Sequence, residues 1–275
     1  MRGSTITLQD YPLEESLRIF RAAGFNSLEL WKGHLVRART AELRSRVAAF
    51  VRDLGISMGG FNAVGEEYYQ PFGDERARQA TLEGLKADTE IALSLGTRDV
   101  LIWEGVAPKG TSEQHWLERL LPQLVELLQS ALDYGKPQGV RYLVEPHPFT
   151  VGMSDRFLIA LCDALDPERF GVTFDFCHYG VGRKNDYVAA IHKLEHRIRH
   201  IHFSDSDQQT SELHFPPGAG RMDIDSMLRA FREIGYRGTI TLDLYGYPLP
   251  VQALASSANG LQKAAEFLNI EADDV

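Results

Sequence analysis

Two kinds of hydrophobic pattern alternate along this chain. Short apolar runs are separated by longer stretches in which apolar residues recur three and four positions apart. The first pattern is typical of buried strands and the second of amphipathic helices. Strands are therefore predicted at residues 5–8, 25–31, 56–61, 99–103, 142–145, 172–174, 199–203 and 239–244.

Helices are predicted between these strands, several of them closed by a glycine such as Gly24, Gly55 or Gly96. Inside the helical pattern of residues 117–131, Pro122 predicts a kink or a new start, because proline cannot donate the helix hydrogen bond. The other predicted helices cover residues 13–20, 41–54, 75–95, 155–165, 187–194, 224–234 and 251–267.

Strict alternation of strands and helices predicts a parallel sheet with right-handed crossovers. Because no linker interrupts the eight units, an α/β fold of the (β/α)8 TIM barrel type is favoured over an open sheet. One domain is expected over residues 1–275, with a frayed acidic tail at 271–275. A long loop on the active face is expected at residues 62–73; this loop and 104–110 are expected to set specificity.

Composition narrows the function classes. The 44% hydrophobic and 24% charged content is that of a globular protein, and the net charge of −9 argues against a nucleic-acid partner. No apolar run reaches the ~20 residues of a membrane span, and no signal peptide is evident. The two cysteines, Cys162 and Cys177, form no disulfide framework. We therefore expect a cytoplasmic protein with no membrane association.

Four predicted strands in succession end on a residue that can bind a metal. These residues are Glu145, Asp175, His202 and Asp243. In such a barrel the ends of neighbouring strands lie ~4.8 Å apart on one rim, so the side chains can meet around one ion. Three carboxylates and one imidazole suit Mn²⁺, Mg²⁺, Co²⁺ or Zn²⁺. Each residue alone has another interpretation: an Asp can cap the next helix, and His202 can be an ordinary core histidine.

Further polar residues follow the predicted strand ends. His147 and His178 could hydrogen-bond a substrate hydroxyl, transfer a proton, or orient ligands. Glu104 and Arg221 are candidate substrate contacts, although an arginine there can equally be a surface residue. Three other polar residues, Glu29, Lys32 and His34, could face a pocket, whereas His200 is expected to point away from His202. Cys177 is expected to pack beside the site, and His192 and His196 to be solvated.

With these residues in place, the chain resembles the sugar phosphate isomerase/epimerase family, the xylose-isomerase-like TIM barrels. The resemblance is carried by an ordered set of stretches: VEPHP (144–148), FDFCHYGVG (174–182), HIHFSDSD (200–207), PPGAGRMDID (216–225) and GYRGTITLDLY (235–245). It implies that Glu145, Asp175, His202 and the last carboxylate hold the metal and that His178 touches substrate. The last ligand is usually Glu in this family, whereas Asp243 is one methylene shorter.

The resemblance implies a metal-dependent isomerase or epimerase of a sugar, sugar phosphate or related polyol ketone, acting through an enediolate. Glu145 is the expected base, supported by His178 and His147. One alternative is a dehydratase of a hydroxy-ketone such as an inosose or dehydroshikimate, which the Glu145–His147 pair resembles. Another is a barrel that binds sugar without catalysis. The family also allows a homo-oligomer.

Overall fold

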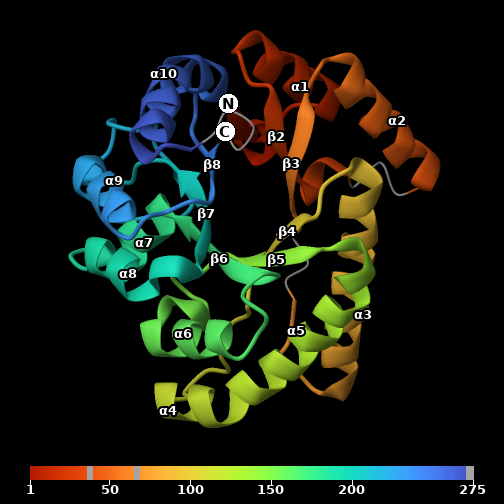
Figure 1. Ribbon diagram of the computed structural model, residues 1–275, viewed down its shortest axis with the longest axis vertical. Coiled ribbons are helices and arrows are strands. Elements are labelled where there is room, and N and C mark those ends of the chain that lie inside the picture. The colour runs from red at the N-terminus through yellow and green to blue at the C-terminus, as the bar shows by residue number, and fades with distance from the viewer. Residues whose placement is uncertain (36–39, 65–68, 271–275) are drawn as a thin grey trace.

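Eight parallel strands close into a barrel in chain order in the computed structural model, which describes residues 1–35, 40–64 and 69–270 (Figure 1). Each strand pairs with its neighbours in sequence, and β1 pairs with β8 to close the barrel. The predicted (β/α)8 barrel is confirmed. The strands are β1 (Arg2–Ser4), β2 (Ser27–Trp31), β3 (Ser57–Asn62), β4 (Asp99–Ile102), β5 (Arg141–Val144), β6 (Phe170–Asp175), β7 (Ile198–Phe203) and β8 (Thr239–Leu242).

The first strand lies earlier than predicted. Residues Thr5–Leu8 form a 3₁₀ helix, η1, and the strand is Arg2–Ser4. At this point the backbone N–H of Trp31 donates to the Thr5 hydroxyl (2.8 Å), so a side chain has replaced the strand ladder. The prediction of a strand at 5–8 was wrong because an apolar run this short fits a strand and a helical turn equally well.

Helices surround the barrel on its outside (Figure 1). The predicted helices are confirmed with small shifts at their ends: α1 (Leu13–Ala22), α2 (Ala41–Asp53), α3 (Glu75–Leu95), α5 (Leu121–Gly135), α6 (Asp155–Asp163), α8 (Tyr187–Leu194), α9 (Ile224–Glu233) and α10 (Pro250–Leu268). The expected break at Pro122 is present, because α4 (Glu113–His115) and a π-helical turn (Trp116–Leu120) precede α5. The predicted tail at 271–275 and part of the 62–73 loop lie outside the described residues.

One short helix, α7 (Phe176–Gly182), had no counterpart in the prediction. It starts directly after β6, where the Asp175 carboxylate accepts a hydrogen bond from the backbone N–H of His178 (2.7 Å). This is an N-cap, which satisfies one of the free N–H groups at a helix start. The helix therefore places His178 one turn beyond Asp175, on the same rim of the barrel.

Alternation along the strands separates an apolar layer from a polar interior. Phe174 on β6 stacks on Tyr179 and meets Phe231 of α9 edge-on, so it faces the helices. Its neighbours Thr173 and Asp175 point to the opposite side, into the barrel, because strand side chains alternate. Within the described part of the chain, no helix combines the length and the apolarity that crossing a bilayer requires.

An ion-pair cluster on Asp155 ties α6 to the end of α7. The Asp155 carboxylate accepts from Arg183 (2.9 Å) and Lys193 (2.9 Å), and Arg183 also donates to the Met153 carbonyl. Burial alone would raise the pKa of Asp155, but hydrogen bonds from these two cations lower it. The ionised carboxylate of Asp155 therefore stabilises the folded protein at pH values above the unfolded-state pKa, which is about 3.9 for Asp. This contribution is lost as the pH falls through the lower pKa of the folded state.

We accordingly expect Asp155→Asn to lower the free energy of unfolding by about 1–2 kcal/mol at pH 7. Urea unfolding at pH 7 and below pH 4 measures the effect, and the difference from the wild type should shrink at the lower pH. Asp186→Asn is the control, because the Asp186 side chain is 48% exposed and its ion pairs are screened by water. An equal loss in both variants, or one independent of pH, would contradict this assignment.

Candidate active and metal-binding site

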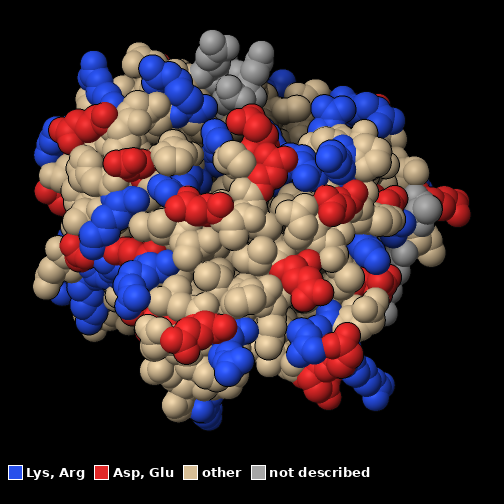
Figure 2. All heavy atoms as spheres, turned by 60° about the horizontal axis from the view of Figure 1, so that its bottom comes forward, with Lys and Arg blue, Asp and Glu red and all other residues tan. Residues whose placement is uncertain are grey.

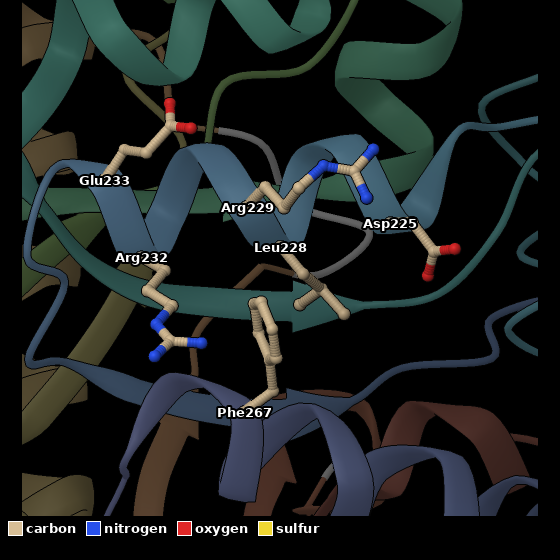
Figure 3. Close-up of a pocket in the computed structure, with 6 residues that line it drawn as sticks. All are labelled: Asp225, Leu228, Arg229, Arg232, Glu233 and Phe267. Carbon is tan, nitrogen blue, oxygen red and sulfur yellow. The ribbon is translucent and has the colours of Figure 1, made fainter.

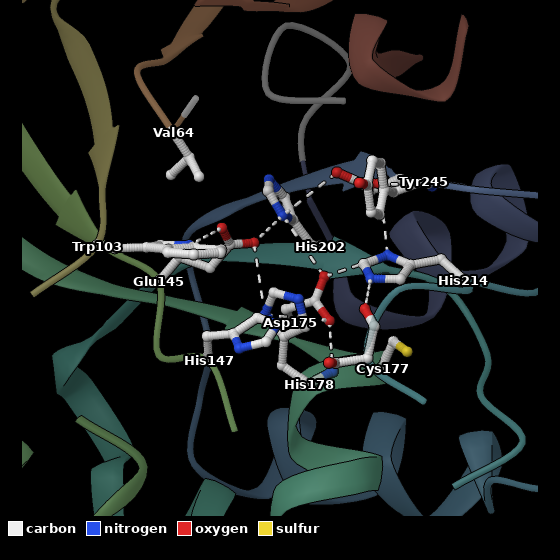
Figure 4. A network of polar contacts seen from close by, with 12 residues as sticks. Val64, Trp103, Glu145, His147, Asp175, Cys177, His178, His202, His214 and Tyr245 are labelled. Atoms are coloured by element: carbon white, nitrogen blue, oxygen red, sulfur yellow. Dashed lines mark hydrogen bonds and ion pairs between the residues drawn. The ribbon is translucent and has the colours of Figure 1, made fainter. Parts of the chain in front are cut away.

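Four strands deliver the predicted ligands to one rim of the barrel. Asp175 is the last residue of β6, His202 lies near the end of β7, and Glu145 and Asp243 directly follow β5 and β8. All four are buried. Because the strands are parallel, their carboxyl ends lie together, and Figure 4 shows Glu145, Asp175 and His202 pointing toward one another.

The imidazole of His202 is the hub of this cluster. Its Nδ1 lies 2.6 Å from Glu145 Oε1, and 3.6 Å from both Asp175 Oδ2 and Asp243 Oδ2. Trp103 donates through Nε1 to the other oxygen of Glu145 (3.0 Å), which fixes the orientation of that carboxylate. The structure thus brings the three carboxylates of the predicted ligand set around one nitrogen atom of the fourth ligand, His202.

Charge in the cluster is balanced by histidines. Burial alone would raise the pKa of Asp175, but His178, His214 and His202 hold that pKa below its usual range. Burial alone would lower the pKa of His202, but the carboxylates of Glu29 and Glu145 raise it well above its usual value. A buried group of carboxylates needs such positive partners, whether imidazolium groups or a metal cation.

The donor set fits a divalent cation. Buried polar atoms without a hydrogen-bond partner include Asp175 Oδ2, His178 Nδ1 and His214 Nδ1. Glu145, Asp175 and His202 offer ligand atoms that all lie within 4.8 Å of one another, and so do Asp175, His178 and His214. Unpaired buried polar atoms are costly, and a cation among these oxygens and nitrogens would satisfy them.

His214 belongs to this cluster, although the sequence did not single it out. Its Nδ1 lies 3.4 Å from Asp243 Oδ1 and 3.7 Å from Asp175 Oδ2, and its Nε2 lies 3.2 Å from the Ser211 carbonyl. The Ser211 carbonyl oxygen can only accept a hydrogen bond, so His214 Nε2 carries a proton. Nδ1 of the same ring faces the carboxylates. His214 is therefore a further candidate ligand, beside the short side chain of Asp243.

The loop between β7 and α9 positions His214 through backbone contacts. Asp205 and Phe215 exchange two backbone hydrogen bonds (2.8 and 3.0 Å), and the His214 N–H donates to the Tyr245 carbonyl. The Asp205 carboxylate also accepts from the backbone N–H groups of Gly218 and Gly220. The HIHFSDSD and PPGAG stretches are thus joined to each other. No period in the loop could have located His214, but its position just before PPGAG was an available signal.

A cavity of about 210 Å³ opens above the cluster. Glu145, His147, His178, His214 and Asp243 line it. Its walls are partly apolar, from Ile6, Trp31, Val64, Trp103 and Tyr245. The mixture of aromatic walls with converging polar groups is typical of a small-molecule site.

His147 lies against the aromatic wall of this cavity. Its ring centroid is 4.8 Å from that of Trp103 and 4.4 Å from that of His178. Burial, then the nearby His178, lowers the pKa of His147 to about 2. The imidazole of His147 is therefore neutral and can accept a hydrogen bond, whereas a pKa this low makes it a weak base near neutral pH.

Two predicted substrate contacts lie elsewhere. Arg221 is exposed and is not among the cavity-lining residues. Glu104 is buried behind the wall, where Oε1 accepts from the Gly152 N–H (2.6 Å), and burial raises its pKa to about 7. Trp103 faces the cavity, so the next residue along the extended chain faces away. Neither Arg221 nor Glu104 is among the residues that line the cavity.

The remaining sequence candidates divide into buried and exposed residues. His200 was expected to point away from His202, but both contact Glu29 inside the barrel; residues two apart on a strand share a face. Cys177 is buried, with Sγ 3.5 Å from Ser206 Oγ, as expected of a packed residue. Lys32 pairs with Asp88. The side chains of His192 and His196 are 46% and 68% exposed, as expected.

A hollow on the outer wall of the molecule contains no histidine among its lining residues. Figure 3 shows this hollow of about 470 Å³ between α9 and α10, where Arg232 lies over the ring of Phe267. On the face drawn in Figure 2, among the residues coloured there, basic and acidic side chains are interspersed rather than gathered into a basic strip. The strand-end cavity is therefore the candidate active site.

Residues 17–270 match the model of the xylose isomerase-like TIM barrel family, and the chain belongs to that family. Its relatives include sugar epimerases. It is 26% identical to fructoselysine 3-epimerase of Escherichia coli O157:H7 over 242 residues, 86% of each chain.

Solved structures share the fold. A D-tagatose 3-epimerase-like protein superposes with a TM-score of 0.80 at 19% identity, covering 98% of this chain and 97% of that one. The IOLI protein, whose crystal structure has a binding zinc atom, superposes with a TM-score of 0.76 at 17% identity, covering 98% and 97%.

Proposed function

We propose that this protein is a divalent-metal-dependent epimerase or isomerase of a ketose-like sugar. The observation that carries the proposal is the placement of two carboxylates in one cavity. Glu145 and Asp243 come from β5 and β8, which are not neighbours in the barrel, and both approach Nδ1 of His202. Two carboxylates on different sides of a bound substrate can exchange protons with its two faces.

Glu145, Asp175, His202 and Asp243, with His214 as a further candidate, would hold the cation. When bound, a divalent cation supplies Lewis-acid polarisation of neighbouring carbonyl and hydroxyl oxygens and offsets developing negative charge. The donor set admits Mn²⁺, Mg²⁺, Co²⁺ or Zn²⁺. The zinc in the IOLI protein makes Zn²⁺ one of the metals to test.

The proton transfers are assigned to side chains of this cavity. Glu145 removes the proton from the carbon next to the carbonyl, with its carboxylate held in orientation by Trp103. Asp243, protonated before this step, gives its proton to the opposite face and is left ionised, while Glu145 is left protonated. The product differs only in configuration, and no oxidant is needed. His178 Nδ1 is buried and has no hydrogen-bond partner, so it can bind a substrate hydroxyl. Trp31, Trp103 and Tyr245 supply aromatic walls against which the substrate carbons can pack.

Deuterium exchange tests the proposal. Metal-loaded protein is incubated in D₂O with fructoselysine, D-tagatose, D-psicose, L-ribulose and inososes, and the products are followed by proton NMR. We expect solvent deuterium on one carbon next to the carbonyl, together with the epimer or isomer. A protein that binds metal but neither exchanges nor converts any of these ketones would favour a barrel that binds sugar without catalysis.

A dehydratase is the second candidate, and His147 favours it. Its imidazole follows Glu145 by two residues and faces the same cavity, where it can hydrogen-bond the hydroxyl that leaves as water while Glu145 takes the proton from carbon. Elimination from a hydroxy-ketone creates a conjugated product with a new ultraviolet absorbance. An absorbance rise with an inosose or dehydroshikimate, without epimer, would select the lyase over the epimerase.

A further inference from the structure

A second layer of polar side chains lies inside the barrel, beneath the candidate metal ligands. Glu29 on β2 and His200 on β7 are 0% and 1% exposed. The interior of such a barrel is usually filled by branched apolar residues. A fully buried carboxylate is costly there unless it is paired and hydrogen-bonded, so its partners should show what it is for.

The partners of Glu29 converge on His202. The two oxygens of Glu29 lie 3.1 and 3.2 Å from His202 Nε2. Oε2 is also 3.1 Å from His200 Nε2, and the far nitrogen of His200 contacts the Thr239 hydroxyl. Oε1 accepts from the Asn62 side-chain amide (3.3 Å). The carboxylate is thus held from several sides directly under the hub of the site.

These contacts determine which nitrogen of His202 faces the site. An ionised carboxylate only accepts hydrogen bonds, so Nε2 of His202 must carry a proton toward Glu29. A neutral ring then has its lone pair on Nδ1, the atom that approaches Glu145, Asp175 and Asp243. Such a carboxylate–histidine pair fixes the tautomer and the ring plane of a metal-binding histidine.

The neighbouring backbone leaves room for this arrangement. A Cβ atom on Gly60 of β3 would lie 3.3 Å from Glu29 Cγ and 3.6 Å from Oε2. That is a tight contact with the side chain that supports His202, so glycine gives Glu29 its space. Gly60 is therefore part of the seat of Glu29.

We infer that Glu29 is a positioning residue that holds His202 as an Nδ1 metal ligand, with His200 supporting Glu29 from behind. This inference rests on the proposed function, because it assigns a role in binding the same cation. Glu29 touches neither the cavity nor the substrate. Its effect should therefore appear first in metal affinity and only through the metal in turnover.

Zinc affinity of the metal-free protein, measured by competition with a chelator of known affinity, tests the inference. We expect Glu29→Gln to weaken zinc binding about 10- to 100-fold, and His200→Gln to weaken it less. Glu104→Gln is the matched control, because Glu104 is also a buried glutamate near a strand end but bonds to the Gly152 backbone. Its zinc affinity should equal that of the wild type.

Nitrogen-15 NMR of the zinc-loaded wild type gives a readout that needs no variant. His202 should show metal on Nδ1 and a hydrogen-bonded proton on Nε2. Zinc on Nε2, or wild-type affinity in a folded Glu29→Gln protein, would overturn the role of Glu29 alone. If the wild type binds no divalent cation, the proposed function fails, and the role of Glu29 fails with it.

Discussion

Glu145→Gln is expected to lower kcat by about 10²- to 10⁴-fold, the usual contribution of a positioned acid or base. Glutamine keeps the size of the side chain and can still accept the Trp103 hydrogen bond. It cannot take a proton from carbon. The measurement is the rate of deuterium exchange at saturating metal, with bound metal quantified in each sample so that loss of a ligand is separated from loss of a base.

Two further variants serve as comparisons for Glu145→Gln. Trp103→Phe removes the bond that orients Glu145 but leaves its carboxylate, so we expect a loss smaller than that of Glu145→Gln. His192→Gln changes a histidine whose side chain is 46% exposed, and it should act like the wild type. Full activity of Glu145→Gln with metal bound would remove Glu145 from the role of base.

Asp175→Ala is expected to lower the metal content from about one equivalent per chain to under about one tenth. Asp175 is wholly buried among the other candidate ligands. Metal analysis of protein purified under identical conditions measures the effect. Metal retained at the wild-type level would show that Asp175 is not a ligand.

The alanine variant has a second effect that must be separated from the first. The Asp175 carboxylate also caps α7, and loss of an N-cap costs about 1 kcal/mol. Asp175→Asn keeps a cap acceptor and loses the charge. Both variants should lose metal, but urea unfolding without metal should show the additional destabilisation only in Asp175→Ala. Equal stability of the two variants would contradict the capping role.

Much of the barrel and its four central candidates could be predicted because each depends on local pattern. Apolar periodicity specifies strands and helices, and parallel strands bring their carboxyl ends to one rim. These two patterns were enough to place four candidate residues at that rim, namely Glu145, Asp175, His202 and Asp243. Asp175 caps α7 and also lies in the cluster of candidate ligands, so its two sequence interpretations are compatible with each other.

The missed and misplaced residues depend on contacts that no period encodes. His214 reaches the site because a backbone bridge between Asp205 and Phe215 folds its loop back. Glu104 and Arg221 were predicted to contact the substrate, but neither lines the cavity. Local backbone geometry sets the direction of a side chain in a loop, and a sequence pattern does not encode it. His200 is different, because the spacing of two residues on a strand already implied that it shares the face of His202.

The polar interior beneath the site has a consequence for how this protein can evolve or be stabilised. A barrel core of closely packed aliphatic residues would be easier to keep folded than one that encloses a charged carboxylate and two imidazoles. Replacing Glu29, His200 and His202 with aliphatic residues of similar volume is therefore expected to leave the barrel at least as stable, while removing the metal site proposed above.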